Sequence, residues 1–238
     1  MLYNRGIYFE RCLYMEKIEE IKKIVIDKLS CSAHDLNHTF RVYNNCLRIA
    51  KTLENIDLEV LKYASLLHDI ARTEEDRCQD GSIDHAILGS EEARKILEKF
   101  EINENIINHV CSAIRSHRYR NGIIPDSIEA KILFDADKLD IIGNIGLCRS
   151  YMIAGEYNQN IFNEYDLDQY IKDNLVGGVA NGRVKDMSLH SPNIEFQLKD
   201  IYLPDKMFTE EGKRIAQKRI IKMESFFKEL DKEIKGID

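Results

Sequence analysis

A few polar residues, widely separated in the chain, are predicted to lie on apolar faces of helices. They are His38, the adjacent pair His68 and Asp69, and Asp137, with His117 as a further candidate. Burying one such group without a partner is costly, and an isolated buried carboxylate costs more. A shared divalent cation would satisfy all of them, because two histidines and two aspartates from three helices form a mixed nitrogen and oxygen site with positions left for water. The sequence therefore predicts a metalloenzyme.

Each of these residues has a plainer interpretation when it is taken alone. A single inward histidine such as His38 is usually a core residue whose ring nitrogens are satisfied by neighbours. Asp137 could pair with an arginine instead of a metal. His34, one turn before His38, could support the site from outside the ligand set. His109 and His190 belong to no motif and are interpreted as structural.

The composition is that of an ordinary globular protein. Of the 238 residues, 44% are hydrophobic and 32% are charged, and the formal net charge is −7. This charge argues against a general grip on the phosphate backbone of a nucleic acid. A small anionic partner remains open, because a metal and a few local arginines can reverse the sign of the potential inside a pocket.

The cysteines and the N-terminal residues give information about the cellular compartment of the protein. The six cysteines form no Cys-x-x-Cys pair, which favours reduced packing residues of a cytoplasmic protein; they are Cys12, Cys31, Cys46, Cys78, Cys111 and Cys148. No apolar run approaches transmembrane length, and we expect no membrane partner. Residues 1–15 are unpatterned, so we expect either a loose arm or a true start at Met15.

The spacing of apolar residues predicts an all-α fold. Helices are predicted over 16–29, 37–53, 58–70, 84–100, 103–117 and 209–235, and a helical repeat over 126–154 has Gly143 and Gly146 at a kink or close contact. The stretch 71–83 is predicted to be a loop, and 155–194 a loop or lid with one short helix near 166–174. We therefore expect one helical bundle over 16–238, closed by a long C-terminal helix.

Three segments resemble the motifs of the HD-domain metal-dependent phosphohydrolases, most closely their small single-domain bacterial and archaeal branch. The segments are HDLNHTFRV (34–42), LLHDIAR (66–72) and ILFDADKLDIIGNIG (132–146). The resemblance continues through DHAILGSEEA (84–93), IRSH (114–117) and MFTEEGKRIAQKR (207–219), so it covers about 30–235, with the core motifs in 34–146. An isolated His-Asp pair would be a weak signal, whereas the ordered set is specific. The resemblance implies a single HD domain.

The resemblance also implies a ligand set. The metal ligands would be His38, His68, Asp69 and Asp137, and two histidines that relatives use for a second metal match His85 and His117. His85 begins a helix after a polar stretch, so it could instead be a surface or capping residue. Two histidines with two aspartates suit Mn²⁺, Fe²⁺, Co²⁺, Ni²⁺ or Mg²⁺, and Zn²⁺ is less natural at an octahedral site.

The implied reaction is hydrolysis of a phosphoester or phosphoanhydride bond in a small, nucleotide-like anion. A metal lowers the pKa of bound water from 15.7 toward ~7, and Asp69 would orient that water. Developing negative charge needs fixed cations nearby. Catalytic roles are predicted for Asp69, Arg72, His117 and Lys138, and substrate contacts for Arg41, Arg72, His85, His117 and Lys138.

Two other functions fit the same ligand types. One is a metal-holding domain that senses a nucleotide without turning it over, and the other is an oxygenase with two irons. Glu195 and Phe196 stand where relatives commonly have a His-Phe pair, while Lys199 matches a lysine of the family, so substrate preference could differ. The sequence leaves a homodimer open.

Overall fold

The computed structural model describes residues 3–29, 36–78, 82–118, 122–180 and 182–237, with residues 3–13 as backbone only. The described residues form helices joined by short connections, and their one β-bridge pairs Leu175 with Val184. This confirms the predicted all-α fold. Internal contacts divide the chain into two compact units, Met1–Asp137 and Lys138–Asp238. The predicted single domain over 16–238 and the arm over 1–15 stay predictions.

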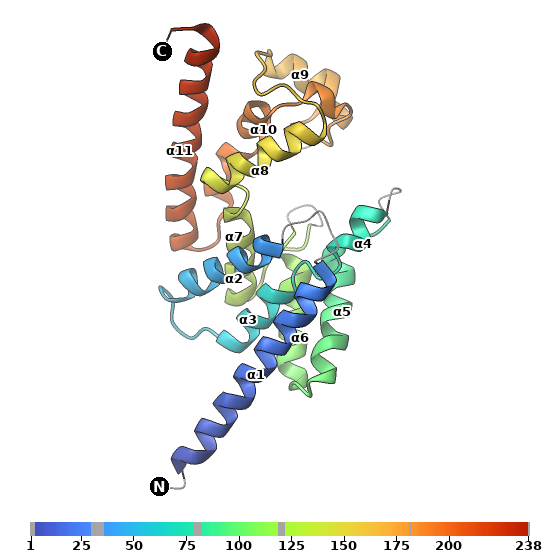
Figure 1. Ribbon diagram of the computed structural model, residues 1–238, viewed down its shortest axis with the longest axis vertical. Helices are drawn as coiled ribbons and strands as arrows, with labels where there is room; N and C mark the ends of the chain where they lie inside the picture. The colour runs from blue at the N-terminus through green and yellow to red at the C-terminus, as the bar shows by residue number, and fades with distance from the viewer. Residues whose placement is uncertain (1–2, 30–35, 79–81, 119–121, 181, 238) are drawn as a thin grey trace. The chain divides into compact units, whose positions relative to one another are not determined.

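The first unit is built around α3, which is central because its side chains are buried almost all round. Helix α3 packs against α1, α2, α5 and α6, and α5 lies alongside α6 (Figure 1). Asp57, Asp84 and Asn103 cap the N-termini of α3, α5 and α6. The helices are α1 Tyr3–Leu29, α2 Leu36–Ala50, α3 Leu58–Leu67, α4 Arg72–Arg77, α5 His85–Lys99, α6 Glu104–Ser116 and α7 Ile128–Leu139.

Two details of this unit differ from the expectations. The helix predicted to begin after Met15 begins at Tyr3. The stretch 71–83, predicted to be a loop, contains the short helix α4. Acidic residues in the first turn of α4 lie near the positive end of the helix dipole and stabilise the helix. Arg72 Nε also donates to Asp76 Oδ1, four residues later, at 3.1 Å. Local charge therefore allows a helix where the apolar pattern is missing.

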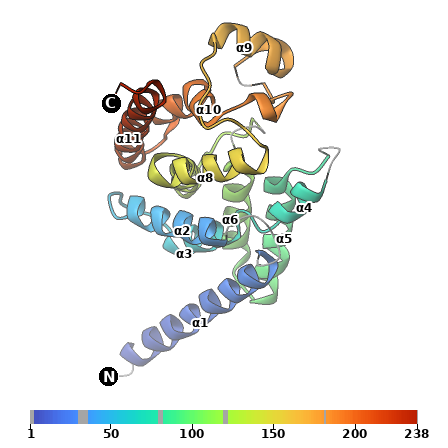
Figure 2. The ribbon, with the colours of Figure 1, turned by 45° about the horizontal axis from the view of Figure 1, so that its top comes forward.

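The second unit is built on α11, which packs against α8 and the 3₁₀ segment η4, while α10 packs against both of these (Figure 2). The long C-terminal helix is confirmed by α11, and the short helix near 166–174 is confirmed by α9. The elements are α8 Gly143–Glu156, α9 Leu167–Asn174, η2 Val176–Gly178, η3 Met187–Leu189, α10 Pro192–Leu198, η4 Asp200–Lys206 and α11 Glu210–Lys235.

The predicted kink within 126–154 is a full break between α7 and α8. Gly143 has a φ of 77°, a left-handed conformation that glycine adopts without steric cost. A Cβ at Gly146 would meet the backbone carbonyl of Ile141. These two glycines let the chain turn tightly from one helix into the next.

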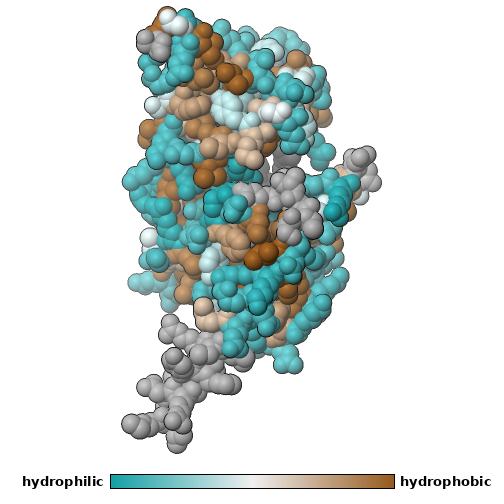
Figure 3. All heavy atoms as spheres, in the orientation of Figure 1, coloured by the Kyte–Doolittle hydropathy of each residue, from teal (hydrophilic) through white to brown (hydrophobic). Residues whose placement is uncertain are grey.

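The surface of the protein mixes polar and apolar side chains. On the face drawn in Figure 3, apolar (brown) and hydrophilic (teal) residues are interspersed. Exposed apolar side chains include Ile124, Met152 and Ile221, which is ordinary for a globular protein. Among the residues that the structure describes, no helix has the length and hydropathy needed to cross a bilayer.

Candidate metal centre

Six of the predicted site residues meet in the first unit and form one cluster, called here the histidine–aspartate cluster. The sequence separates them by up to about a hundred residues, and helices of the first unit bring them together because their apolar faces pack around α3. His38 comes from α2 and Asp137 from α7, while His68 and His117 are the C-cap residues of α3 and α6. The complete cluster is His38, His68, Asp69, His85, His117 and Asp137.

The cluster consists of two groups of three side chains. In each group, one ligand atom from every residue lies within 4.8 Å of the others. The first group contains His38, His68 and Asp137, and the second contains Asp69, His85 and His117. All four histidines are buried. The second pair of histidines, which the resemblance implies only for relatives with a second metal, thus lies in the same cluster as the first.

Asp69 lies between the two groups. Its Oδ2 is 3.5 Å from His38 Nε2 and 3.7 Å from His68 Nε2. Its Oδ1 is 3.3 Å from His85 Nε2 and 3.6 Å from His117 Nε2. One carboxylate oxygen therefore faces each group, an arrangement that suits a bridge between two cations.

The outer ring nitrogens of three histidines face hydrogen-bond acceptors. His68 Nδ1 lies 2.8 Å from the carbonyl oxygen of Ser65, and His117 Nδ1 lies 2.6 Å from that of Ile114. His85 Nδ1 lies 2.6 Å from Glu75 Oε2. A carbonyl or carboxylate can only accept, so each Nδ1 carries the proton, and in a neutral ring Nε2 then presents a lone pair. This is the form of histidine that binds a metal.

The inner ring nitrogens of the cluster carry too few protons to form hydrogen bonds with one another. His85 Nε2 and His117 Nε2 are 3.2 Å apart, a hydrogen-bond distance between two atoms that both present lone pairs. Burial, more than any neighbouring charge, lowers the pKa of His68 to about 4 and also lowers the pKa of His85, so these rings stay neutral near pH 7. Buried acceptors that face one another need a cation, and divalent metals bind this mixture of imidazole and carboxylate donors.

The Asp69 carboxylate is held in its charged form. Burial alone would raise the pKa of Asp69, yet the neighbouring rings of His68, His117 and His38 keep the pKa well below its usual range. A carboxylate that stays ionised inside a buried site is suited to bind a cation.

Glu75 belongs to this site and was missed by the sequence reasoning. Besides His85, its carboxylate contacts the guanidinium of Arg118, which lies 3.1 Å from Asp84 Oδ2. Burial would raise the pKa of Glu75, but His85 and Arg118 lower it below the ordinary value. The only sequence signal was the acidic run TEED shortly after LLHDIAR, in a stretch predicted to be a loop.

The predicted substrate cations differ in their surroundings. Arg72 begins α4 and reaches Glu75 Oε2 at 3.2 Å, Asp76 Oδ1 at 3.1 Å and His85 Nδ1 at 3.5 Å. Arg41 follows His38 by three residues on α2, and Lys138 follows Asp137 on α7. The roles of Arg41, Arg72 and Lys138 in binding substrate stay predictions.

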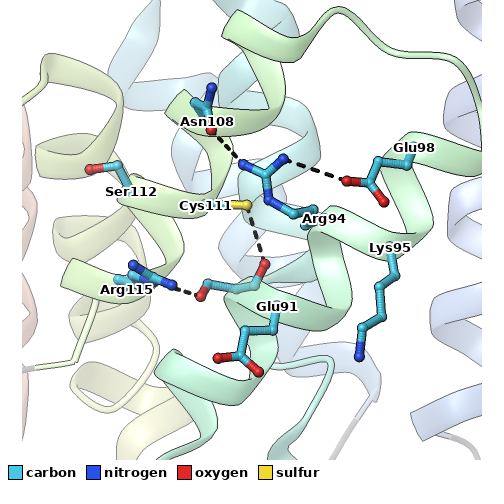
Figure 4. Close-up of a pocket in the computed structure, with 9 residues that line it drawn as sticks. Glu91, Arg94, Lys95, Glu98, Asn108, Cys111, Ser112 and Arg115 are labelled. Atoms are coloured by element: carbon cyan, nitrogen blue, oxygen red, sulfur yellow. Dashed lines mark hydrogen bonds and ion pairs between the residues drawn. The ribbon is translucent and has the colours of Figure 1, made fainter.

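A groove of about 610 Å³ lies between α5 and α6 and is separate from the histidine–aspartate cluster (Figure 4). Arg115 Nε donates to Ser90 Oγ at 2.9 Å, and Arg94 contacts Glu98 and Asn108. Arg115, which flanks His117 in sequence, therefore lines this groove. The lining residues are Ser90, Glu91, Arg94, Lys95, Glu98, Asn108, Cys111, Ser112 and Arg115.

The histidines that belong to no motif form other contacts. His109 Nε2 lies 3.1 Å from Glu129 Oε2 in the first unit. In the second unit, His190 lies between the hydroxyl of Tyr170 at 2.7 Å and Glu195 Oε2 at 3.0 Å. The structural role expected for His109 and His190 stays a prediction. His34, suggested as support for the site, lies outside the described residues.

Comparison with known proteins identifies the relatives of this chain. A sequence model of the HD domain matches residues 35–142, a span that holds all six members of the histidine–aspartate cluster. The protein YpgQ of Bacillus subtilis (strain 168) is 27% identical over 222 residues, which are 92% of each chain.

Solved structures support the same assignment. The crystal structure of Bacillus subtilis YpgQ in complex with ADP is 26% identical, covers 95% of this chain and 99% of its own, and has a TM-score of 0.68. An HD-superfamily hydrolase from Bacillus thuringiensis is 25% identical, with 93% and 98% covered and a TM-score of 0.68. From the matched span, its ordered motifs and these structural relatives, we conclude that residues 35–142 of the chain form a domain of the HD superfamily.

Proposed function

We propose that this protein is a divalent-metal-dependent phosphohydrolase that cleaves a phosphoester or phosphoanhydride bond in a small nucleotide-like molecule. The observation that carries the proposal is the histidine–aspartate cluster, in which buried lone pairs face one another at 3.2 Å. Membership in a superfamily that includes hydrolases, and a relative in complex with ADP, support the reaction class and the nucleotide. The cytoplasmic location, the homodimer and the absence of a nucleic-acid partner stay predictions.

The residues present would hold two cations. His38, His68 and Asp137 would hold the first, His85 with His117 would hold the second, and Asp69 would offer one carboxylate oxygen to each group. The donor set suits Mn²⁺, Fe²⁺, Co²⁺ or Ni²⁺, with Mg²⁺ also suitable and Zn²⁺ less so. When bound, such ions supply a nucleophilic water at neutral pH and neutralise charge on phosphoryl oxygens.

The side chains of this chain then have distinct tasks. Asp69, kept ionised by its histidine neighbours, orients the attacking water. Arg41, Arg72 and Lys138 supply fixed positive charge for the phosphoryl group. Arg72 already contacts two carboxylates. We therefore expect it to stabilise the phosphoryl group less than an arginine without such contacts would.

The test is phosphate and pyrophosphate release from a panel of nucleotides. The protein is stripped with a chelator and resupplied separately with Mn²⁺, Mg²⁺, Co²⁺ or Ni²⁺. We expect metal-dependent release by the native protein, none by Asp69→Ala, and native rates for Asp205→Ala, which removes an exposed carboxylate of the second unit. Circular dichroism checks that Asp69→Ala keeps its helices.

Each other outcome contradicts a stated part of the proposal. Release by Asp69→Ala at the native rate would remove Asp69 from its role. Nucleotide binding with every substrate unchanged over many hours would identify a sensor instead of a hydrolase. Oxygen consumption by the iron-loaded protein would point to the oxygenase.

A further inference from the structure

The histidines of the cluster differ in what their outer ring nitrogens contact. His68 and His117 are each held by a backbone carbonyl three residues earlier, Ser65 and Ile114, in the same helix. His85 is held by Glu75, a charged side chain from a different helix, at 2.6 Å. The outer nitrogen of His85 therefore meets a carboxylate, whereas those of His68 and His117 meet neutral carbonyl oxygens.

We infer that Glu75 is a positioning residue that sets the affinity of the second metal position, the one formed by Asp69, His85 and His117. The inference rests on the proposed two-metal function. A carboxylate behind a ligating imidazole fixes the ring orientation and increases the basicity of the inner nitrogen more than a neutral carbonyl does. His85, the ring that Glu75 contacts, belongs to the second group, so the effect of Glu75 is expected at the second metal position.

Glu75 is itself held in place by a ring of charged side chains. Arg118 contacts Glu75 and lies 3.1 Å from Asp84, and Asp84 accepts from the backbone of Ala86 at 2.8 Å as the N-cap of α5. The ring therefore ties α4, which carries Glu75, to the first turn of α5, which carries His85. Glu75 is held by Arg118, and the helix that begins with His85 is capped by Asp84. The imidazole of His85 is therefore oriented before a metal binds.

The experiment compares Glu75→Gln with Glu74→Gln in the full chain. Both changes remove one negative charge from adjacent positions of α4, but the carboxylate that contacts His85 is that of Glu75. Each chelator-stripped protein is titrated with Mn²⁺, and the bound metal per chain is measured by equilibrium dialysis with elemental analysis. Electron paramagnetic resonance then distinguishes a coupled Mn²⁺ pair from isolated ions.

We expect the native protein and Glu74→Gln to bind two Mn²⁺ and to show the coupled pair. In Glu75→Gln the second binding step should weaken by about 10- to 100-fold, the usual effect of losing an outer partner of a ligand, while the first step keeps its affinity. Glu75→Ala should weaken the second step further, because it also removes the hydrogen-bond acceptor. Thermal unfolding of each metal-free variant checks that the fold is retained.

The outcomes separate failure of this inference from failure of the proposed function. Two unchanged binding steps in Glu75→Gln would overturn the role of Glu75 and leave the two-metal hydrolase intact. Equal weakening of both steps would also overturn it, because Glu75 would then support the whole site. A native protein that binds no Mn²⁺, or only one, would overturn the two-metal function, and the inference with it.

Discussion

Each unit of the molecule contains a buried cluster of polar side chains, and the two clusters are satisfied in opposite ways. In the second unit, the Glu195 cluster comprises Tyr170, Asn174, His190, Glu195 and Lys199. His190 contacts a hydroxyl on one side and a carboxylate on the other, and Lys199 Nζ lies 2.8 Å from Glu195 Oε2. This cluster contains its own cation, so donors and acceptors alternate.

The histidine–aspartate cluster of the first unit has no such alternation. Asp69 faces ring nitrogens of His85 and His117 that present lone pairs, and the two groups of the cluster are arranged around Asp69. The comparison teaches that burial alone does not mark a metal ligand. His190 is as buried as His85, at 5% and 4% exposed, yet only His85 needs an additional cation. Whether a buried histidine needs a metal depends on how many protons the atoms facing its ring nitrogens can donate.

The largest expected difference between the clusters is in metal binding. Asp137→Ala removes a ligand of the first group, so bound Mn²⁺ should fall to at most one per chain. Activity should fall by more than the roughly 100-fold that outer partners of ligands account for. Metal analysis and nucleotide hydrolysis measure both effects. Glu195→Gln is the control from the other cluster, and an equal loss of metal there would contradict the comparison.

In the metal-free protein, lowering the pH should reduce the stability contributed by the histidine–aspartate cluster before it reduces that contributed by the Glu195 cluster. The pKa of His68 is about 4 in the fold and 6.5 when exposed, so below pH 6.5 the unfolded chain takes up a proton that the folded ring refuses. The free energy of unfolding therefore decreases as the pH falls from 6.5 to about 4, by on the order of 3 kcal/mol. Burial is the main cause of the lowered pKa of His68.

Urea unfolding in the presence of chelator at several pH values measures this decrease. His68→Gln should flatten the slope between pH 6.5 and 4. The second cluster responds later, because the pKa of Glu195 is about 2 and its contribution is lost only as the pH falls from about 4.5 toward 2. An equal slope in the native protein and His68→Gln would show that other groups control acid stability.

Within the second cluster, Glu195→Gln should destabilise the fold without changing metal content. The change leaves Lys199 and His190 with a neutral partner. Losing a charged partner typically costs about 1–3 kcal/mol, and a Glu195 side chain that is 33% exposed places the expected cost at the lower end. Urea unfolding at pH 7 gives the cost, and elemental analysis gives the metal ratio. A changed ratio would mean that the two clusters are coupled.

The smallest effect is expected for Tyr170→Phe. The lost hydroxyl contacts His190 Nδ1 at 2.7 Å and accepts from Asn174 Nδ2 at 3.0 Å, while the ring remains to fill the same volume. We expect a loss of about 0.5–1.5 kcal/mol in the free energy of unfolding. Native stability in this variant would show that Asn174 and water replace the hydroxyl at no cost.

The residues of the metal centre were predictable because a polar side chain on an apolar helix face violates the helical pattern. His38 precedes apolar residues at helical spacing, whereas His117 and Asp137 follow them, and the structure brings all three into one cluster. The start of α3 was predictable for a different local reason, because aspartate at position 57 is a residue type that caps helix N-termini.

Contacts between segments without an apolar pattern were not predictable. Glu75 lies in a polar stretch, and its pairing with His85 depends on how α4 packs against α5. Arg115 and Arg118 both flank His117, but α6 ends at Ser116. Arg115 therefore follows the helix toward Ser90, whereas Arg118 lies past the helix end and reaches Glu75. The direction of a side chain beyond a helix terminus is set by tertiary packing.

The placement of His68 and His117 as C-cap residues has a consequence for protein design. The last carbonyls of a helix lack partners within the helix, and here a histidine ring donates to one of them three residues back. This hydrogen bond satisfies a carbonyl at the helix end and also places the proton on Nδ1. The unprotonated Nε2 is then directed away from the helix end, into the cluster. Four consecutive residues thus encode an oriented ligand, a module that could be transferred to the end of any helix facing a cavity.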